Sequence, residues 1–149
     1  MSGALVVAAA RGWIGTPYVH QASVRGYGAD CLGLVRGVWR DILHREPETV
    51  PAYTMDWSEP LGDEQLLQAC RRIMQAKHLD EDALGDVLLF RMRDGSVAKH
   101  LGLQSQIGAN ARFIHAYSGH GVIETPLTAP WYRRIVGRFA FPQSQERGA

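Results

Sequence analysis

The sequence of 149 residues predicts a single α+β domain in which helices near the N-terminus pack against one antiparallel sheet. Apolar residues at helical spacing are confined to the part before Gly85, and short β-prone segments separated by turn residues follow it. Helices first and strands later, without βαβ alternation, are typical of the α+β class. A hydrophobic content of 46% suits one packed core, so we expect residues 1–149 to form one domain.

The first predicted helix begins after Ser2, a favourable N-cap residue, and ends before Gly15. Its apolar residues fall at helical spacing: Leu5, Val6, Ala9 and Trp13. Residues 15–30 contain several glycines, Pro17, two tyrosines and a histidine. This composition predicts a loop with side chains that can contact a ligand.

The second predicted helix covers Cys31–His44, with Asp30 as its N-cap. Cys31 therefore falls in the first turn, at the positive end of the helix dipole. A third, amphipathic helix is predicted over Asp63–Lys77, and Cys70 lies on its apolar stripe, where a core thiol is expected.

Five strands are predicted after Gly85: Asp86–Met92, His100–Gln106, Arg112–Tyr117, Gly121–Thr125 and Ile135–Phe141. A turn at residues 108–110 would join the second and third of these as a hairpin. In that hairpin His100 and His115 can be neighbours on one face. Strand alternation directs His100 away from the side on which Leu101 and Leu103 are buried.

Composition argues against several classes of protein. A formal net charge of +1 disfavours a dedicated nucleic-acid binder, since the one dense basic cluster, Arg133, Arg134 and Arg138, is small. No apolar run approaches the roughly 20 residues that span a bilayer, so we expect no membrane insertion. Residues 4–10 lack the preceding basic residue and the cleavage site of a secretory signal, which favours synthesis in the cytoplasm without a signal peptide.

Cys31 is the candidate nucleophile, because a helix N-terminus stabilises a thiolate and the neighbouring Gly33 leaves room for a substrate carbonyl. His100 and His115 are the candidate partners of this thiol, one as the general base and the other as the residue that orients it. The simpler alternatives are a buried structural thiol, a solvated histidine at a strand end and a hydrogen-bonded core histidine. A zinc site made of these three residues lacks paired ligand spacing and would consume the nucleophile, so we expect no metal.

Four ordered blocks resemble the NlpC-type cell-wall cysteine peptidases, and the resemblance runs from about Trp13 to Phe141. The blocks are Gly15-Thr16-Pro17-Tyr18, Asp30-Cys31-Leu32-Gly33-Leu34-Val35, Lys99-His100-Leu101-Gly102-Leu103 and Phe113-Ile114-His115-Ala116. This resemblance implies a papain-like fold with N-terminal helices against a five- to six-stranded antiparallel sheet. It also implies one catalytic domain without a separate wall-binding domain, and no cofactor.

By position in these blocks, the resemblance makes Cys31 the nucleophile, His100 the base and His115 the orienting residue. Tyr18 matches a tyrosine that contacts the oxyanion or the substrate, and Asp30 matches a residue that shapes the pocket. The expected reaction is hydrolysis of an amide in the peptidoglycan stem peptide, typically between D-glutamate and a diamino acid. Leu32 stands where many members have Ser, which leaves the stem specificity open, and His20 has no assigned role.

Longer strings resemble the branch of the family that tailed phages and gene transfer agents carry: residues 18–23, 31–40 and 85–92. This likeness implies that tail or baseplate proteins are partners, and that the enzyme opens the cell wall of a recipient on the periplasmic side for DNA delivery. Two alternatives stay open. One is a papain-like acyltransferase or transglutaminase, in which an amine resolves the thioester, and the other is a catalytically silent tail-assembly subunit.

Overall fold

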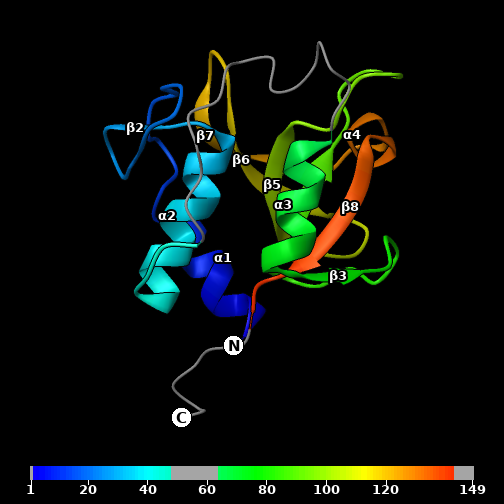
Figure 1. Ribbon diagram of the computed structural model, residues 1–149, viewed down its shortest axis with the longest axis horizontal. Coiled ribbons are helices and arrows are strands. Elements are labelled where there is room, and N and C mark those ends of the chain that lie inside the picture. The colour runs from blue at the N-terminus through cyan, green and yellow to red at the C-terminus, as the bar shows by residue number, and fades with distance from the viewer. Residues whose placement is uncertain (1, 48–63, 143–149) are drawn as a thin grey trace.

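The computed structural model describes residues 2–47 and 64–142, and these form helices around a twisted sheet (Figure 1). In chain order the elements are α1 (Gly3–Arg11), β1 (Ser23–Val24), β2 (Gly28–Ala29), α2 (Cys31–Leu43), α3 (Gln65–Ile73), β3 (Gln75–Lys77), β4 (Val87–Phe90), β5 (His100–Gln106), β6 (Arg112–Tyr117), β7 (Gly121–Pro126), α4 (Ala129–Arg133) and β8 (Ile135–Ala140). The predicted α+β class is confirmed. In the described part of the chain, no helix combines the length and apolar character needed to cross a bilayer.

The main sheet has six strands in the order β3-β8-β4-β5-β6-β7, and every neighbouring pair is antiparallel. The five predicted strands are all present. The sixth is β3, which pairs with β8 at one edge. The β5–β6 hairpin turns at Gly108, whose φ of +89° suits a residue without a Cβ atom.

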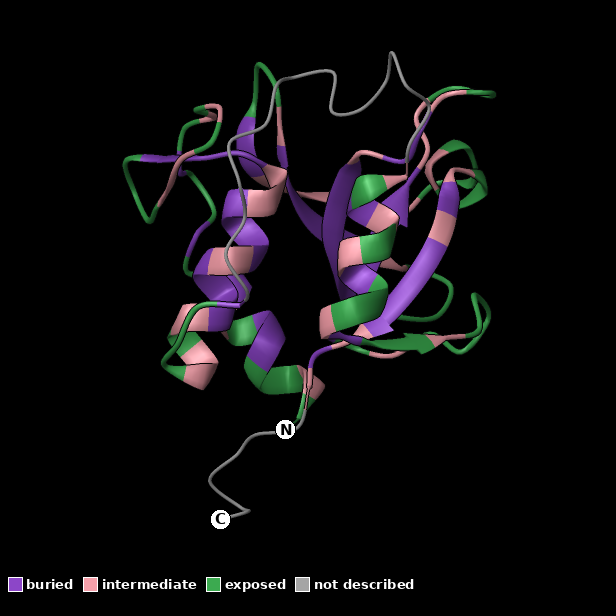
Figure 2. Cartoon of the chain, in the orientation of Figure 1, coloured by how far each residue is buried: buried purple, intermediate pink, exposed green. Residues whose placement is uncertain are grey.

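Each face of the sheet has its own apolar cluster, and β4 and β5 are buried between them (Figure 2). On the helix face, residues of α1, α2 and α3 pack against Leu89, Leu101 and Leu103. On the opposite face, Phe90 and Phe113 pack with Trp131 of α4. The alternation of β5 therefore gives its leucines to one face and leaves the other face for His100.

Helix α1 begins as predicted, with the Ser2 side chain accepting a hydrogen bond from the Leu5 backbone N–H. Its buried residues differ in part from the prediction. Leu5 is about half exposed, whereas Val7 and Ala10 face the core. The helix has nine residues and ends at Arg11, so the buried Trp13 lies beyond it, and its apolar stripe is rotated relative to the predicted one.

Three other expectations need correction. The third predicted helix ends at Ile73, because Met74 is already extended and the next three residues pair with β8, while Asp63 lies outside the described residues. The predicted loop 15–30 contains the short antiparallel pair β1–β2. Helix α4, which was not predicted, precedes β8.

The basic cluster near the C-terminus is divided by the fold. The side chain of Arg138 is buried and donates to the Asp86 carboxylate at 2.9 Å and to Gln104 at 2.6 Å. Arg133 is exposed and Arg134 is half-buried, both near the end of α4. Arg138 is therefore a core ion-pair residue, because a buried guanidinium needs such partners, and it adds nothing to a basic surface.

Candidate active site

Helix α2 holds Cys31 at its first position. Asp30 caps this helix, since its Oδ1 accepts a hydrogen bond from the Gly33 N–H at 2.8 Å. A Cβ atom at position 33 would clash with the Ala22 carbonyl oxygen, so glycine permits the close approach of the preceding loop. These two local features fix the backbone from which the Cys31 side chain projects.

The half-buried Cys31 thiol points to the beginning of β5. It donates a hydrogen bond of 3.7 Å to the carbonyl oxygen of Lys99, the residue before His100. No hydrogen bond joins Cys31 directly to His100 in the residues that the structure describes. The thiol therefore reaches the strand that carries the candidate base, and it is bonded to the backbone there.

Burial decides the charge of this thiol. The pKa of Cys31 is raised to about 12, chiefly by burial and also by the neighbouring Asp30 carboxylate, although backbone N–H groups of Leu101, Leu32 and Cys31 itself oppose the shift. The expected stabilisation by the helix N-terminus is thus present but is exceeded by desolvation. Cys31 is a neutral thiol in the resting site.

His100 and His115 contact each other directly, as their placement in one hairpin predicts. His100 Nε2 lies 2.8 Å from His115 Nδ1, and His115 Nε2 lies 3.0 Å from Thr125 Oγ1. In the tautomer of His100 whose Nδ1 carries no proton, the Nε2–H of His100 donates to His115 Nδ1, and the Nε2–H of His115 donates to Thr125. One consistent set of tautomers therefore runs along the three side chains and leaves His100 Nδ1 as the basic nitrogen.

Aromatic rings surround the two imidazoles on this face of the sheet. The Trp131 ring centroid lies 5.9 Å from that of His100 and 5.2 Å from that of His115, while Phe90 and Tyr117 contact His100 at 5.6 and 6.0 Å. Burial lowers the pKa of His100 to about 4, and burial together with the nearby His100 and His120 lowers that of His115 to about 3. Both imidazoles are neutral near pH 7.

Tyr18 lies in the loop before α2 and forms an isolated parallel bridge with Ala29. Burial, Cys31 and Asp30, in that order, raise the pKa of the Tyr18 phenol to about 12. The phenol thus keeps its proton and can donate a hydrogen bond to a negatively charged oxygen near Cys31.

Asp30 has a second structural role beside its cap. Its Oδ2 accepts a hydrogen bond of 2.7 Å from the Gln21 N–H and lies 3.7 Å from Nδ1 of the half-buried His20. The Asp30 side chain is 3% exposed. Asp30 therefore ties the loop of residues 18–22 to the start of α2, and its part in shaping the pocket stays a prediction.

The structure thus makes two groups of the predicted site residues. Cys31, Tyr18 and Asp30 meet at the start of α2, and His100 with His115 forms the second group. The two groups approach each other where β5 begins. Leu32, in place of the family's Ser, is half-buried and packs against the core cluster on the helix face.

Sequence reasoning missed Thr125 and Trp131. Thr125 follows Ile123, which pairs with His115, so alternation along β7 puts Thr125 on the same face as His115. That signal was available from the hairpin pattern. Trp131 lies in a helix of five residues, which is too short to show periodicity.

No group of three His, Cys, Asp or Glu side chains suited to a metal ion is present among residues 2–47 and 64–142. The expectation that Cys31, His100 and His115 bind no zinc stays a prediction.

A helix-initial cysteine next to a histidine-bearing antiparallel sheet defines a papain-like α+β domain, and solved structures support this fold. The chain belongs to the NlpC/P60 family, whose model matches residues 15–139. Comparison with curated proteins gives no significant match.

Three solved structures illustrate the fold. The NlpC/P60 domain of the peptidoglycan hydrolase SagA superposes with a TM-score of 0.65 at 22% identity, over 95% of this chain and 100% of that one. An NLP/P60 protein similar to a lipoprotein, from Staphylococcus aureus, gives 0.62 at 20% identity over 95% of this chain. A family protein from Bacillus cereus gives 0.61 at 20% identity over 93%. The chain spans 42% and 39% of the last two proteins.

Proposed function

We propose that the protein is a cysteine peptidase that hydrolyses an amide bond in the stem peptides of peptidoglycan, between D-glutamate and a diamino acid. The observation that carries this proposal is the 2.8 Å contact between His100 Nε2 and His115 Nδ1. The Cys31 thiol contacts the carbonyl of Lys99, the residue that precedes His100 in the chain. Membership of the NlpC/P60 family and the likeness to the SagA peptidoglycan hydrolase domain support the substrate class.

Acyl transfer to sulfur begins from a neutral pair in this site. The Cys31 thiol turns from the Lys99 carbonyl to His100 Nδ1, which takes its proton as the sulfur attacks the substrate carbonyl carbon. His115 accepts from the Nε2–H of His100 and so stabilises the imidazolium that forms. The protonated His100 then gives its proton to the leaving amine.

The negative charge of the tetrahedral intermediate needs fixed donors. The backbone N–H of Cys31 and the phenol of Tyr18 supply them, because a phenol with a pKa raised to about 12 stays protonated. A water molecule deprotonated by His100 hydrolyses the thioester and releases the free enzyme. No metal is needed for these steps.

Digestion of purified peptidoglycan, read by mass spectrometry of the released fragments, tests the activity. The wild type should release stem-peptide fragments cut at the D-glutamyl bond, and Cys31→Ala should release none. Cys70→Ala is the matched control, since Cys70 is a thiol buried in the core away from the site, and it should keep the activity. Equal release by Cys31→Ala and the wild type would contradict the proposed nucleophile.

The same digestion separates hydrolysis from transfer. Adding a primary amine should leave the products as free carboxylic acids if water resolves the thioester. Products that carry the amine would instead support an acyltransferase. In Cys70→Ala protein Cys31 is the one remaining thiol. If that variant took up no thiol-directed electrophile at neutral pH, the result would support a catalytically silent subunit.

We further propose that the enzyme works as part of a phage-like or gene-transfer-agent tail and opens the wall of a recipient cell locally. The support is the likeness of residues 18–23, 31–40 and 85–92 to that branch of the family. Purified particles should contain the chain at a fixed ratio to tail proteins. Recovery of the chain only as free protein, and never with particles, would contradict this role.

A further inference from the structure

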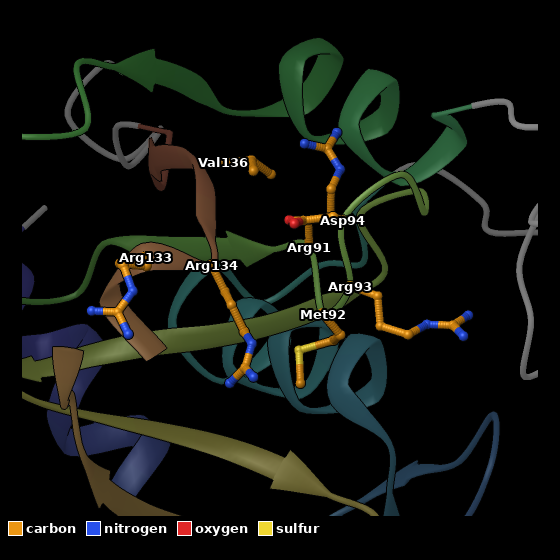
Figure 3. Close-up of a pocket in the computed structure, with 7 residues that line it drawn as sticks. All are labelled: Arg91, Met92, Arg93, Asp94, Arg133, Arg134 and Val136. Carbon is orange, nitrogen blue, oxygen red and sulfur yellow. The ribbon is translucent and has the colours of Figure 1, made fainter. Parts of the chain in front are cut away.

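A cavity of about 370 Å³ lies between the end of β4 and the junction of α4 with β8 (Figure 3). Four arginines line it: Arg91, Arg93, Arg133 and Arg134. Among the described residues that line it, Asp94 is the one acidic residue. The backbone N–H of Arg91 donates to the Arg134 carbonyl at 2.8 Å, so the two walls are joined.

The four guanidinium groups are not equally engaged. Arg91 donates to the Glu64 carboxylate at 2.8 Å and to the Ser96 carbonyl at 2.7 Å. In the described part of the chain, no carboxylate pairs with Arg133 or Arg134. The α4 side of the cavity therefore presents positive charge without a bound acid, and this favours an anionic ligand.

The cavity lies next to the candidate active site. The Arg134 guanidinium carbon is 5.7 Å from the Trp131 ring centroid, and the same ring is 5.9 Å from His100. One tryptophan ring thus separates the basic cavity from the candidate base. An extended peptide covers about 3.5 Å per residue, so a group a few residues from the scissile bond could reach Arg134.

We propose that this cavity is a substrate subsite that binds a carboxylate of the stem peptide, a few residues from the bond that is cleaved. The proposal rests on the proposed function and adds a specificity element to it. Arg133 and Arg134 supply forked N–H donors that match the two oxygens of a carboxylate. Met92, which also lines the cavity, gives the adjoining peptide segment an apolar surface.

The test compares two stem peptides that differ only in a free or an amidated terminal carboxyl group. With the wild type, we expect KM to be about 10-fold lower for the free acid, as one charge-assisted hydrogen bond predicts. Arg133→Gln should reduce this preference, and Arg133→Gln with Arg134→Gln should abolish it, with little change for the amide. Arg45→Gln, which removes an exposed arginine outside the cavity, should keep the full preference.

A binding measurement keeps the proposal separate from the proposed function. In the Cys31→Ala background, the NMR signal of the Trp131 indole N–H should shift with the free acid and respond far less to the amide. The double arginine variant should lose that difference. Wild type that cleaves neither peptide would refute the proposed function, while this titration would still decide the subsite.

Three results would overturn the subsite. The first is equal affinity of the wild type for the free acid and the amide, and the second is an equal effect of the arginine substitutions on both peptides. The third is an indole shift with inorganic phosphate at concentrations where the free acid gives none. That outcome would assign the cavity to a phosphate-bearing ligand.

Discussion

The two neutral histidines make the stability of the fold depend on pH. Burial lowers the pKa of His100 from 6.5 to about 4 and that of His115 to about 3. Above pH 6.5 both are neutral in the folded and the unfolded chain. As the pH falls through 6.5 toward 4, these histidines become protonated in the unfolded chain but stay neutral in the folded chain. The free energy of unfolding therefore decreases in this pH range.

The size of this decrease follows from the pKa values. At pH 5 the pH lies about 1.5 units below the pKa of each histidine in the unfolded chain. This difference corresponds to a loss of about 2 kcal/mol in the free energy of unfolding per histidine, and about 4 kcal/mol for the pair. This is a large part of the 5–15 kcal/mol that is typical of a domain. For Glu64 and Glu124, burial raises the pKa, but hydrogen bonds and the charges of their arginine partners outweigh it and leave a lowered pKa. Their contribution to stability is therefore lost only as the pH falls below about 4.5.

Urea unfolding at pH 7.5, 6.0 and 5.0 measures this effect in the wild type and in His100→Gln. The free energy of unfolding of the wild type should fall by about 4 kcal/mol over this range. That of His100→Gln should fall by about 2 kcal/mol, because one buried neutral histidine, His115, remains. His78→Gln, which changes an exposed histidine, should follow the wild type. Parallel pH dependence of the wild type and His100→Gln would refute the buried neutral pair.

Four further predictions follow from the site. The activity should fall as the pH drops through about 4, where His100 gains a proton. A pH profile of kcat/KM that instead reports an essential group with a pKa near 7 would contradict this. Thr125→Val should lower kcat about 5- to 10-fold while Thr125→Ser keeps most of it, because the hydroxyl orients His115; steady-state kinetics on the stem peptide decides. Asp30→Ala should reduce the free energy of unfolding by about 2 kcal/mol through loss of the cap, measured by urea titration, and Asp30→Asn should lose less. Gly33→Ala should destabilise by at least about 2 kcal/mol, since its Cβ would meet the Ala22 carbonyl, and a thermal melt equal to that of the wild type would disprove this.

The sequence predicted the parts of the fold that local signals define. Asp30 is both a cap and the boundary of a periodic apolar segment, so helix α2 and the position of Cys31 followed directly. The β5–β6 hairpin was predictable because a glycine turn joins two alternating segments. From these two elements came the expected proximity of His100 and His115.

Tertiary pairing decided what the sequence did not predict. Strand β3 has two exposed residues and no alternating apolar pattern, and it exists because β8 offers a free edge. The neutral charge of Cys31 is a second case. A helix N-terminus lowers a thiol pKa in isolation, but the surrounding core and Asp30 raise it more, and burial is not visible in a local pattern.

The two faces of β5 explain the resting arrangement of the site. Leu101 and Leu103 join the core on the helix face, whereas the His100 ring belongs with Phe90 and Trp131 on the other. A thiol that projects from α2 therefore reaches His100 only around the start of the strand, where it now contacts the Lys99 carbonyl. With a thiol pKa near 12 and an imidazole pKa near 4, the proton stays on sulfur until a substrate is present. In the proposed reaction, proton transfer would then accompany attack, because stabilisation of the developing oxyanion by Tyr18 and the first turn of α2 would make the charge separation favourable.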